Sequence, residues 1–200
     1  MLKRIFNRIL KFFEIGHITS EGNVVYVTFD DGPEPGITEF VLDELDKYGM
    51  KATFFCKGEN AVKNPDLFRQ LIERGHAIGN HTYSHINSFE NSSKDYERDV
   101  MKADNVLHTQ LFRPPWGCLT FSAYLRLRKH FKIIYWSQES GDTQLTNFNL
   151  DKNFSRLISW TKAGDIILFH FCKRHEHETR ELLPLYLKWL SDNHYISKSI

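Results

Sequence analysis

VVYVTFDDGP, residues 24–33, is the stretch that decides the fold. Its first six residues are β-branched or aromatic, which predicts a buried strand that ends at the Gly32-Pro33 turn. Asp30 and Asp31 therefore come together at a strand end. Side chains alternate along a strand, but a turn lets both carboxylates point into one pocket, where one binds a metal ion and the other handles protons. The alternative is a plain polar turn.

Two histidines downstream favour the metal site. His81 and His85 are one helical turn apart, so on a helix or helical turn both imidazoles would face one ion. With Asp31 they form a set of two histidines and one carboxylate, which leaves coordination positions open for water and substrate, as a catalytic site requires. A chance surface pair is the alternative, because the chain has 10 histidines. The three residues together suggest a hydrolase.

Five segments, in order, resemble the motifs of the polysaccharide deacetylase family, also called the NodB homology domain or carbohydrate esterase family 4. They are residues 28–33 (TFDDGP), 81–85 (HTYSH), 113–117 (RPPWG), 136–142 (WSQESGD) and 168–170 (LFH). Residues 52–55 and 75–80 also resemble the family. The likeness spans roughly residue 24 to the C-terminus, and five motifs in order with suitable intervals are not expected by chance.

The resemblance implies an α/β fold, the irregular (β/α) barrel of this family, with motif residues at the carboxyl ends of the strands. It implies a divalent metal ion on Asp31, His81 and His85, with zinc as the first choice and cobalt, nickel or iron as alternatives. Asp30 would be the general base. Arg113 would orient it and favour its ionised form.

The resemblance also implies the remaining catalytic roles. His170 would be the general acid that protonates the departing amine, and Asp142 would raise its pKa. A backbone N–H at Trp116 would stabilise the oxyanion. The expected substrate-binding residues are Pro114, Pro115, Trp116 and Leu168, with Leu168 lining the pocket for the acetyl methyl group.

Three positions depart from the family pattern. Trp116 replaces the commoner tyrosine, Glu139 occupies a position where aspartate is common, and Thr143 replaces the tryptophan that usually follows the aspartate. We expect one wall of the substrate groove to differ. His175, Glu176 and His177 are expected in a solvated loop or helix start, and His76 is expected to be structural.

The expected reaction is metal-dependent removal of acetyl groups from an N-acetylated sugar, giving an amine and acetate. Peptidoglycan, chitin-like oligomers, capsular glycans and lipid-linked sugars are all compatible. One alternative is a deacylase of other amides or acetyl esters, including lipid-linked sugar deformylation. A second is a catalytically silent glycan-binding module.

Composition is consistent with one enzyme domain. The chain has 200 residues and 41% hydrophobic content, enough for one sizeable core. Its 26 basic and 25 acidic residues nearly cancel, so charge gives no support to nucleic-acid binding. Cys56, Cys118 and Cys172 lack Cys-x-x-Cys spacing and are expected to be reduced thiols, which favours a reducing compartment.

Strand-like and helical segments alternate along the chain. Strands are predicted near residues 24–29, 52–56, 132–136 and 165–171, and helices near 37–48, 64–75, 96–107, 154–161 and 182–190. The helix at 64–75 has a predicted N-cap at Asn64, a first residue at Pro65 and a stop signal at Gly75. The alternation predicts a parallel α/β sheet or barrel.

The N-terminus has a different pattern. Residues 1–13 combine apolar positions at helical spacing with lysines and arginines, so we expect an amphipathic basic helix that packs on its own domain or lies on an anionic membrane surface. A linker at 16–23 would complete an N-terminal segment, 1–23, ahead of a deacetylase domain at 24–200. No signal-peptide pattern or membrane-spanning stretch is visible, which favours a cytoplasmic location or the inner membrane face.

Overall fold

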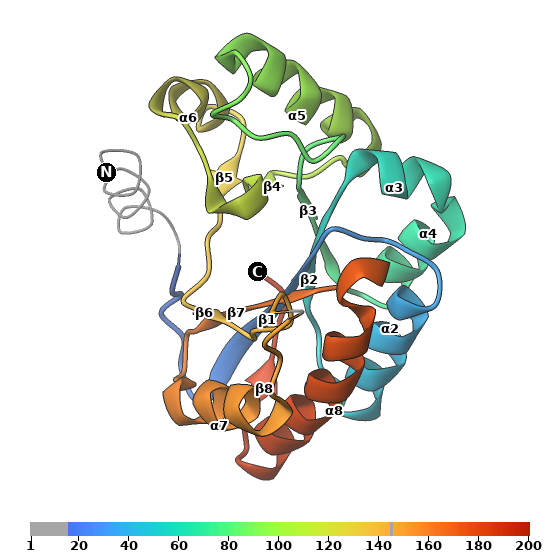
Figure 1. Ribbon diagram of the computed structural model, residues 1–200, viewed down its shortest axis with the longest axis vertical. Coiled ribbons are helices and arrows are strands. Elements are labelled where there is room, and N and C mark those ends of the chain that lie inside the picture. The colour runs from blue at the N-terminus through green and yellow to red at the C-terminus, as the bar shows by residue number, and fades with distance from the viewer. Residues whose placement is uncertain (1–15, 145) are drawn as a thin grey trace.

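The fold is built on one parallel sheet, in a computed structural model that describes residues 16–144 and 146–200 (Figure 1). The sheet follows the order β5-β4-β3-β2-β1-β7-β6, and β8 pairs with β1 off this path. The strands are β1 (Val24–Asp30), β2 (Thr53–Cys56), β3 (Ala77–Asn80), β4 (Leu111–Phe112), β5 (Lys132–Ile133), β6 (Gln138–Glu139), β7 (Ile166–His170) and β8 (Ile196–Ser197). Because β5 and β6 end the path, the sheet forms a half-barrel, which confirms the predicted irregular (β/α) barrel.

Helices connect the strands. They are α2 (Ile37–Lys47), α3 (Gly58–Lys63), α4 (Pro65–Glu73), α5 (Ser93–Leu107), α6 (Phe121–Leu127), α7 (Leu150–Trp160) and α8 (Glu176–Asp192), with short 3-10 turns η1 (Pro115–Gly117) and η2 (Lys173–His175). In Figure 1, α5 and α6 lie beside β4 and β5, whereas α7 and α8 lie at the opposite end beside β6 and β7. The helices predicted near residues 37–48, 64–75, 96–107, 154–161 and 182–190 are all present.

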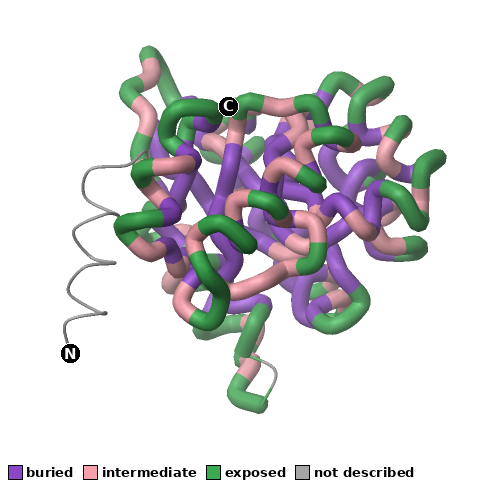
Figure 2. The backbone as a smooth tube through the Cα atoms, turned by 90° about the horizontal axis from the view of Figure 1, so that it is seen from above, coloured by how far each residue is buried: buried purple, intermediate pink, exposed green. Residues whose placement is uncertain are grey.

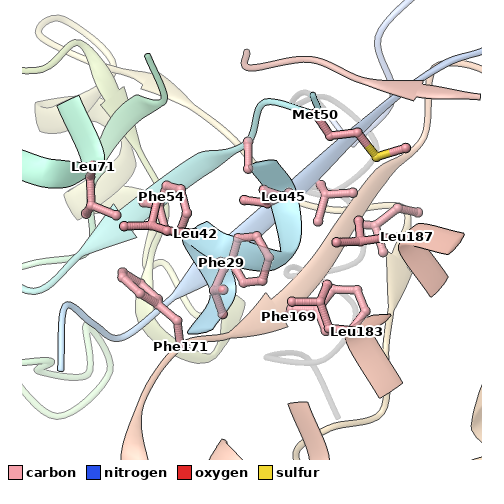
Figure 3. Close-up of a cluster of buried hydrophobic side chains, with 14 of the residues drawn as sticks. Phe29, Leu42, Leu45, Met50, Phe54, Leu71, Phe169, Phe171, Leu183 and Leu187 are labelled. Atoms are coloured by element: carbon pink, nitrogen blue, oxygen red, sulfur yellow. The ribbon is translucent and has the colours of Figure 1, made fainter. Parts of the chain in front are cut away.

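Side chains along β1 and β7 point alternately to the hydrophobic core on one face of the sheet and to the site on the other. Phe29 stacks on Phe54 of β2 with ring centroids 5.1 Å apart, and it also contacts Phe169 of β7 at 5.8 Å. These rings pack with leucines of α2 and α8 (Figure 3), in the buried interior seen in Figure 2. Since neighbouring side chains on a strand point to opposite faces, Asp30 and His170 lie on the other face, inside the half-barrel.

The start of α4 ties the helix layer to the Asp-Asp-Gly-Pro turn. Asn64 and Pro65 occupy the predicted cap and first positions, and Gly75 follows the helix with a φ of 77°. The Asn64 side chain makes no capping hydrogen bond, however, and its Nδ2 donates to the Pro33 carbonyl at 3.1 Å. The residue predicted as a cap therefore holds the turn that follows the aspartates.

Other segments differ from the prediction. The strand predicted at 132–136 ends at Ile133 in the sheet. Part of the predicted linker contacts the domain, because the Ile18 N–H donates to the Gly164 carbonyl at 2.8 Å. The helix predicted at residues 1–13 lies outside the described residues and stays a prediction. Within the described part of the chain, no helix has the length and apolarity that crossing a membrane requires.

Candidate functional site

The polar residues predicted for the site meet at the carboxyl ends of the central strands. Asp30 ends β1, His170 ends β7, and these two residues are register partners across the parallel ladder. His81 directly follows β3, and Arg113 directly follows β4. The fold thus collects four sequence-distant residues at one edge of the sheet.

Arg113 is the buried partner of Asp30. Its side chain is fully enclosed, and Nη1 donates to Asp30 Oδ1 and to Thr28 Oγ1, both at 2.8 Å. The other guanidinium nitrogens donate to the backbone carbonyls of Ile134 and Tyr135, at 3.2 and 3.1 Å. One Asp30 oxygen is therefore held in place by a rigid cation, which confirms the predicted pairing of the two residues.

Asp31, His81 and His85 form the predicted cluster of ligand atoms. Asp31 Oδ1 lies 3.1 Å from His85 Nε2 and 3.5 Å from His81 Nε2, and the three donor atoms lie within 4.8 Å of one another. Burial opposes ionisation of Asp31, but the surrounding imidazoles of His85, His81 and His170 hold its pKa well below the usual range. The carboxylate is therefore ionised, as a metal ligand must be.

His81 is held as the neutral tautomer that a metal ligand needs. Its Nδ1 lies 2.7 Å from the Arg113 carbonyl, so Nδ1 carries the proton and Nε2 keeps a lone pair facing Asp31. Burial lowers the pKa of His81 to about 4, despite the opposing charges of Asp30 and Asp31. The imidazole is neutral at pH 7.

The two histidines do not lie on a helix, so that part of the prediction is wrong. Residues 81–85 form an irregular loop in which Thr82 and His85 adopt positive φ values of 64° and 56°. The Asp99 carboxylate of α5 accepts the backbone N–H groups of residues 83–84 at 2.7 and 3.1 Å. This clamp, rather than helical spacing, turns both imidazoles toward Asp31.

The cluster of Asp31, His81 and His85 has an unsatisfied acceptor that a metal ion would fill. Asp31 Oδ1 is enclosed, and no donor among the described residues is aligned to give it a hydrogen bond. A divalent cation would satisfy this oxygen and the two imidazole nitrogens together. Two histidines and a carboxylate suit zinc and also cobalt, nickel or iron. The donor set fits such an ion.

His170 and Asp142 form a second buried pair. His170 Nδ1 lies 3.0 Å from Asp142 Oδ1, and the His170 backbone N–H donates to Asp142 Oδ2 at 2.6 Å. Burial alone would lower the pKa of His170, but the Asp142 charge and hydrogen bond raise it to about 9. The hydroxyl of Thr179, which the sequence did not single out, supports the pair by donating to Asp142 Oδ2 at 3.2 Å.

Asp30, the ligand cluster and the His170–Asp142 pair open onto one pocket of about 330 Å³. The residues that line it are Asp30, Asp31, His81, His85, Trp116, Trp136, Glu139, Asp142, Thr143, Leu168, His170, Arg174 and His175. Leu168 and Trp116 are on the wall as predicted, and the Trp116 ring lies 4.3 Å from His85 between centroids. Pro114 and Pro115, also expected to bind substrate, are buried and are not among the lining residues.

The segment after β7 differs from its prediction. Glu176 begins α8, so a helix does start there, but His175 is only 6% exposed rather than solvated. Arg174 and His175 both line the pocket, although neither was predicted to belong to the site. No motif or spacing marks them, because a short turn places them at the site. His76 is structural as predicted, since its Nδ1 accepts the Ala52 N–H at 3.2 Å.

Comparisons with known proteins agree with this site. The family model described as "Polysaccharide deacetylase" matches residues 17–130. A peptidoglycan-N-acetylglucosamine deacetylase of Bacillus cereus is 32% identical over 165 residues, which cover 78% of this chain and 78% of that protein. A chitooligosaccharide deacetylase of Azorhizobium caulinodans is 29% identical over 165 residues, with the same 78% coverage of each.

A solved structure extends the likeness to nearly the whole chain. The crystal structure of the Bc1960 peptidoglycan N-acetylglucosamine deacetylase superimposes with a TM-score of 0.87 at 27% sequence identity, over 98% of this chain and 94% of that one. The similarity therefore continues past residue 130 and includes the segment that contains Asp142 and His170.

Proposed function

The chain belongs to the polysaccharide deacetylase family and is a carbohydrate N-deacetylase, and from this premise we propose its mechanism and its substrate class. It removes the acetyl group from an N-acetylglucosamine-type sugar by hydrolysis, giving a free amine and acetate. The observation that supports this most is the meeting of a metal-ligand cluster, an enclosed carboxylate and a carboxylate-paired histidine in one pocket.

Asp31, His81 and His85 would hold the metal ion. A bound divalent ion supplies Lewis acidity, which lowers the pKa of a bound water to about 7 in favourable sites. The chain's contribution is to keep the ligands ready, with Asp31 ionised and His81 neutral. Asp99 adds rigidity by fixing the loop between the histidines.

Asp30 would accept the proton of the attacking water. Oδ1 is engaged by Arg113, whereas Oδ2 lies 3.8 Å from His81 Nε2, on the side of the ligand cluster. The Arg113 hydrogen bonds fix the rotamer of this carboxylate, so its free oxygen faces the place where water would be activated. Precise placement of a base next to the reacting water is worth about 10²–10⁴-fold in rate.

His170 would deliver the proton that the departing amine needs. With a pKa raised to about 9, the imidazole is protonated at neutral pH, and Asp142 fixes its Nδ1 so that Nε2 is the end free to donate. The Trp116 backbone N–H would stabilise the oxyanion that forms when water attacks the acetamide. Leu168 offers an apolar contact for the acetyl methyl group.

The substrate class follows from the relatives. Those relatives are named as deacetylases of peptidoglycan N-acetylglucosamine and of chitooligosaccharides, and both substrates present an acetamide on carbon 2 of a glucosamine ring. We therefore propose an N-acetylated glycan as the substrate of this chain too. A silent glycan-binding module is the competing function, and the retained base, acid and ligand cluster argue against it.

Acetate release from N-acetylglucosamine oligomers tests the proposal. The parent protein should release acetate in the presence of zinc or cobalt, and Asp30→Asn should lower the rate by about 10²–10⁴-fold. Asp151→Asn, the same change at an exposed position of α7, is the matched control and should match the parent. Oligomer binding without any acetate release from the parent would favour the binding module.

A further inference from the structure

Two donors at the rim of the pocket have no partner within the described residues. The Arg174 guanidinium is exposed, lines the pocket and makes neither an ion pair nor a hydrogen bond to any described residue. His175 is only 6% exposed, and its Nδ1 is enclosed without a hydrogen-bond partner among those residues. Buried polar groups are nearly always paired, so the His175 ring calls for an explanation.

The tautomer of His175 follows from this enclosure. A proton on Nδ1 would leave a donor buried and unpaired, which is less favourable than leaving a lone pair there. The proton therefore belongs on Nε2, and His175 is one of the residues that line the pocket. Burial, together with the charge of His170, lowers the pKa of His175, so the ring is neutral and offers a single N–H donor.

The acids of the pocket, in contrast, already have partners. Asp30 is paired with Arg113, and Asp142 is paired with His170. Glu139 Oε1 accepts the indole N–H of Trp136 at 2.9 Å. Asp31 belongs to the ligand cluster. Outside the ligand cluster, the carboxylates that line the pocket among the described residues are thus already paired, and none of them is paired with Arg174 or His175.

The position of these donors indicates which part of a substrate they reach. The His170 and His175 ring centroids lie 5.1 Å apart, so His175 is next to the acid that protonates the amine on carbon 2. Carbons 1 and 3 flank carbon 2 in the sugar ring. Arg174 and His175 line the same pocket as His170, so they are placed to reach a group on one of these two carbons.

We propose that Arg174 and His175 form a subsite for an acidic substituent, a carboxylate or a phosphate, on the ring carbon next to the N-acetyl group. This inference rests on the proposed deacetylase function and narrows its substrate class to acidic N-acetylated sugars. Arginine pairs with carboxylates and phosphates through two parallel hydrogen bonds, and a neutral imidazole N–H adds a third donor.

Competing substrates test the subsite. The neutral probe is an N-acetylglucosamine oligomer. The acidic probes are N-acetylmuramic acid glycosides, which carry a carboxylate, and N-acetylglucosamine 1-phosphate. For each acidic probe, kcat/KM is divided by the value for the neutral oligomer. In Arg174→Gln this ratio should fall about tenfold for one of the two probes, which identifies the acidic group.

Matched variants separate recognition from general damage. Lys173 is the adjacent exposed cation and does not line the pocket, so Lys173→Gln should leave the ratio unchanged. His175→Phe keeps a ring but removes the donor and should lower the ratio, whereas His175→Gln, which restores an N–H, should recover part of it. Unchanged melting temperatures establish that the His175 variants are folded.

The possible failures can be told apart. Equal ratios in the parent and Arg174→Gln for both acidic probes would overturn the subsite while leaving the deacetylase function intact. Calorimetric binding of the acidic probes provides a readout that does not need turnover. Binding that weakens in Arg174→Gln, in a parent protein that releases no acetate from any probe, would support the subsite and contradict the proposed reaction.

Discussion

His170 Nδ1 lies 3.0 Å from Asp142 Oδ1, and the same aspartate accepts the His170 backbone N–H through its other oxygen. One carboxylate thus fixes both the ring and the main chain of the residue that ends β7. This arrangement sets the orientation of the imidazole and raises its pKa.

The pair predicts a pH dependence. Burial lowers the pKa of His170, and Asp142, helped by Asp31 and Asp30, raises it to about 9. The acid must be protonated, and its protonated fraction decreases as pH rises through the pKa. Asp142→Asn leaves burial in place without the charge, so the alkaline limb of kcat/KM should move to lower pH. Rate profiles and an NMR titration of His170 in metal-free protein measure this shift, and a limb that does not move contradicts it.

The free energy of unfolding should also decrease as the pH rises through the pKa of His170. The folded state holds this proton more tightly than the unfolded chain, because the His170 pKa is raised from 6.5 to about 9. The stabilisation is therefore fully present below the unfolded pKa and is lost as pH rises through about 9. Urea unfolding of metal-free protein across this interval, compared with Asp142→Asn, should show the difference shrinking toward alkaline pH.

Arg113 and Asp30 should depend on each other for stability. Because both are buried, Arg113→Met leaves the Asp30 charge unpaired and should destabilise the fold by about 3–5 kcal/mol. Adding Asp30→Asn should recover part of that loss. The control is Arg126→Met, which breaks a partly exposed pair with Glu97 and should cost under about 1 kcal/mol. Urea unfolding of the parent, Arg113→Met, Asp30→Asn and the double variant gives the coupling energy. Additive effects at Asp30 and Arg113 would argue against the pairing.

Asp99 should control metal affinity without binding the metal itself. Its carboxylate holds the backbone of the loop between His81 and His85. Asp99→Ala frees that loop, so zinc affinity should weaken by about 10–100-fold. Competition with a chromogenic chelator measures this. Asp104→Ala on the same helix removes a carboxylate that binds Thr109 instead and should keep the parent affinity, so equal losses in both variants would point to general damage of α5.

Gly32 should tolerate no side chain. A Cβ at this position would lie 2.4 Å from the ring of Phe171, directly after the two aspartates. Gly32→Ala should therefore destabilise the protein by about 1–3 kcal/mol. In a Phe171→Ala background the same change should be much less harmful, because the obstructing ring is gone. An equal loss of stability in both backgrounds would contradict a steric origin.

Most of the residues that meet at the site were predictable from the sequence, and their geometry was not. Asp30 and Asp31 follow one predicted strand and His170 lies near the end of another, so the carboxyl ends of a parallel sheet had to bring them together. The side chains of His81 and His85 meet Asp31 as expected, but they do so from an irregular loop and not from a helical turn. Their loop depends on Asp99, fourteen residues beyond His85, and no local pattern encodes that contact.

Residues outside the motifs were the least predictable. His175 is in a charged stretch that suggested solvent, yet the turn between β7 and α8 folds it against His170. Its burial depends on the packing of a helix that begins one residue later, which the hydropathy of the segment does not reveal. The amphipathic segment 1–13 and the location of the protein in the cell stay predictions.

Metal-dependent acetate release tests the central claim most directly. Protein stripped of metal should release no acetate from N-acetylglucosamine oligomers and should recover activity when zinc or cobalt is added. His81→Ala should stay inactive under the same conditions, while His130→Ala, an exposed histidine on the surface, should behave as the parent. Release that survives both metal removal and His81→Ala would contradict the account, because the cluster of Asp31, His81 and His85 would then have no part in the reaction.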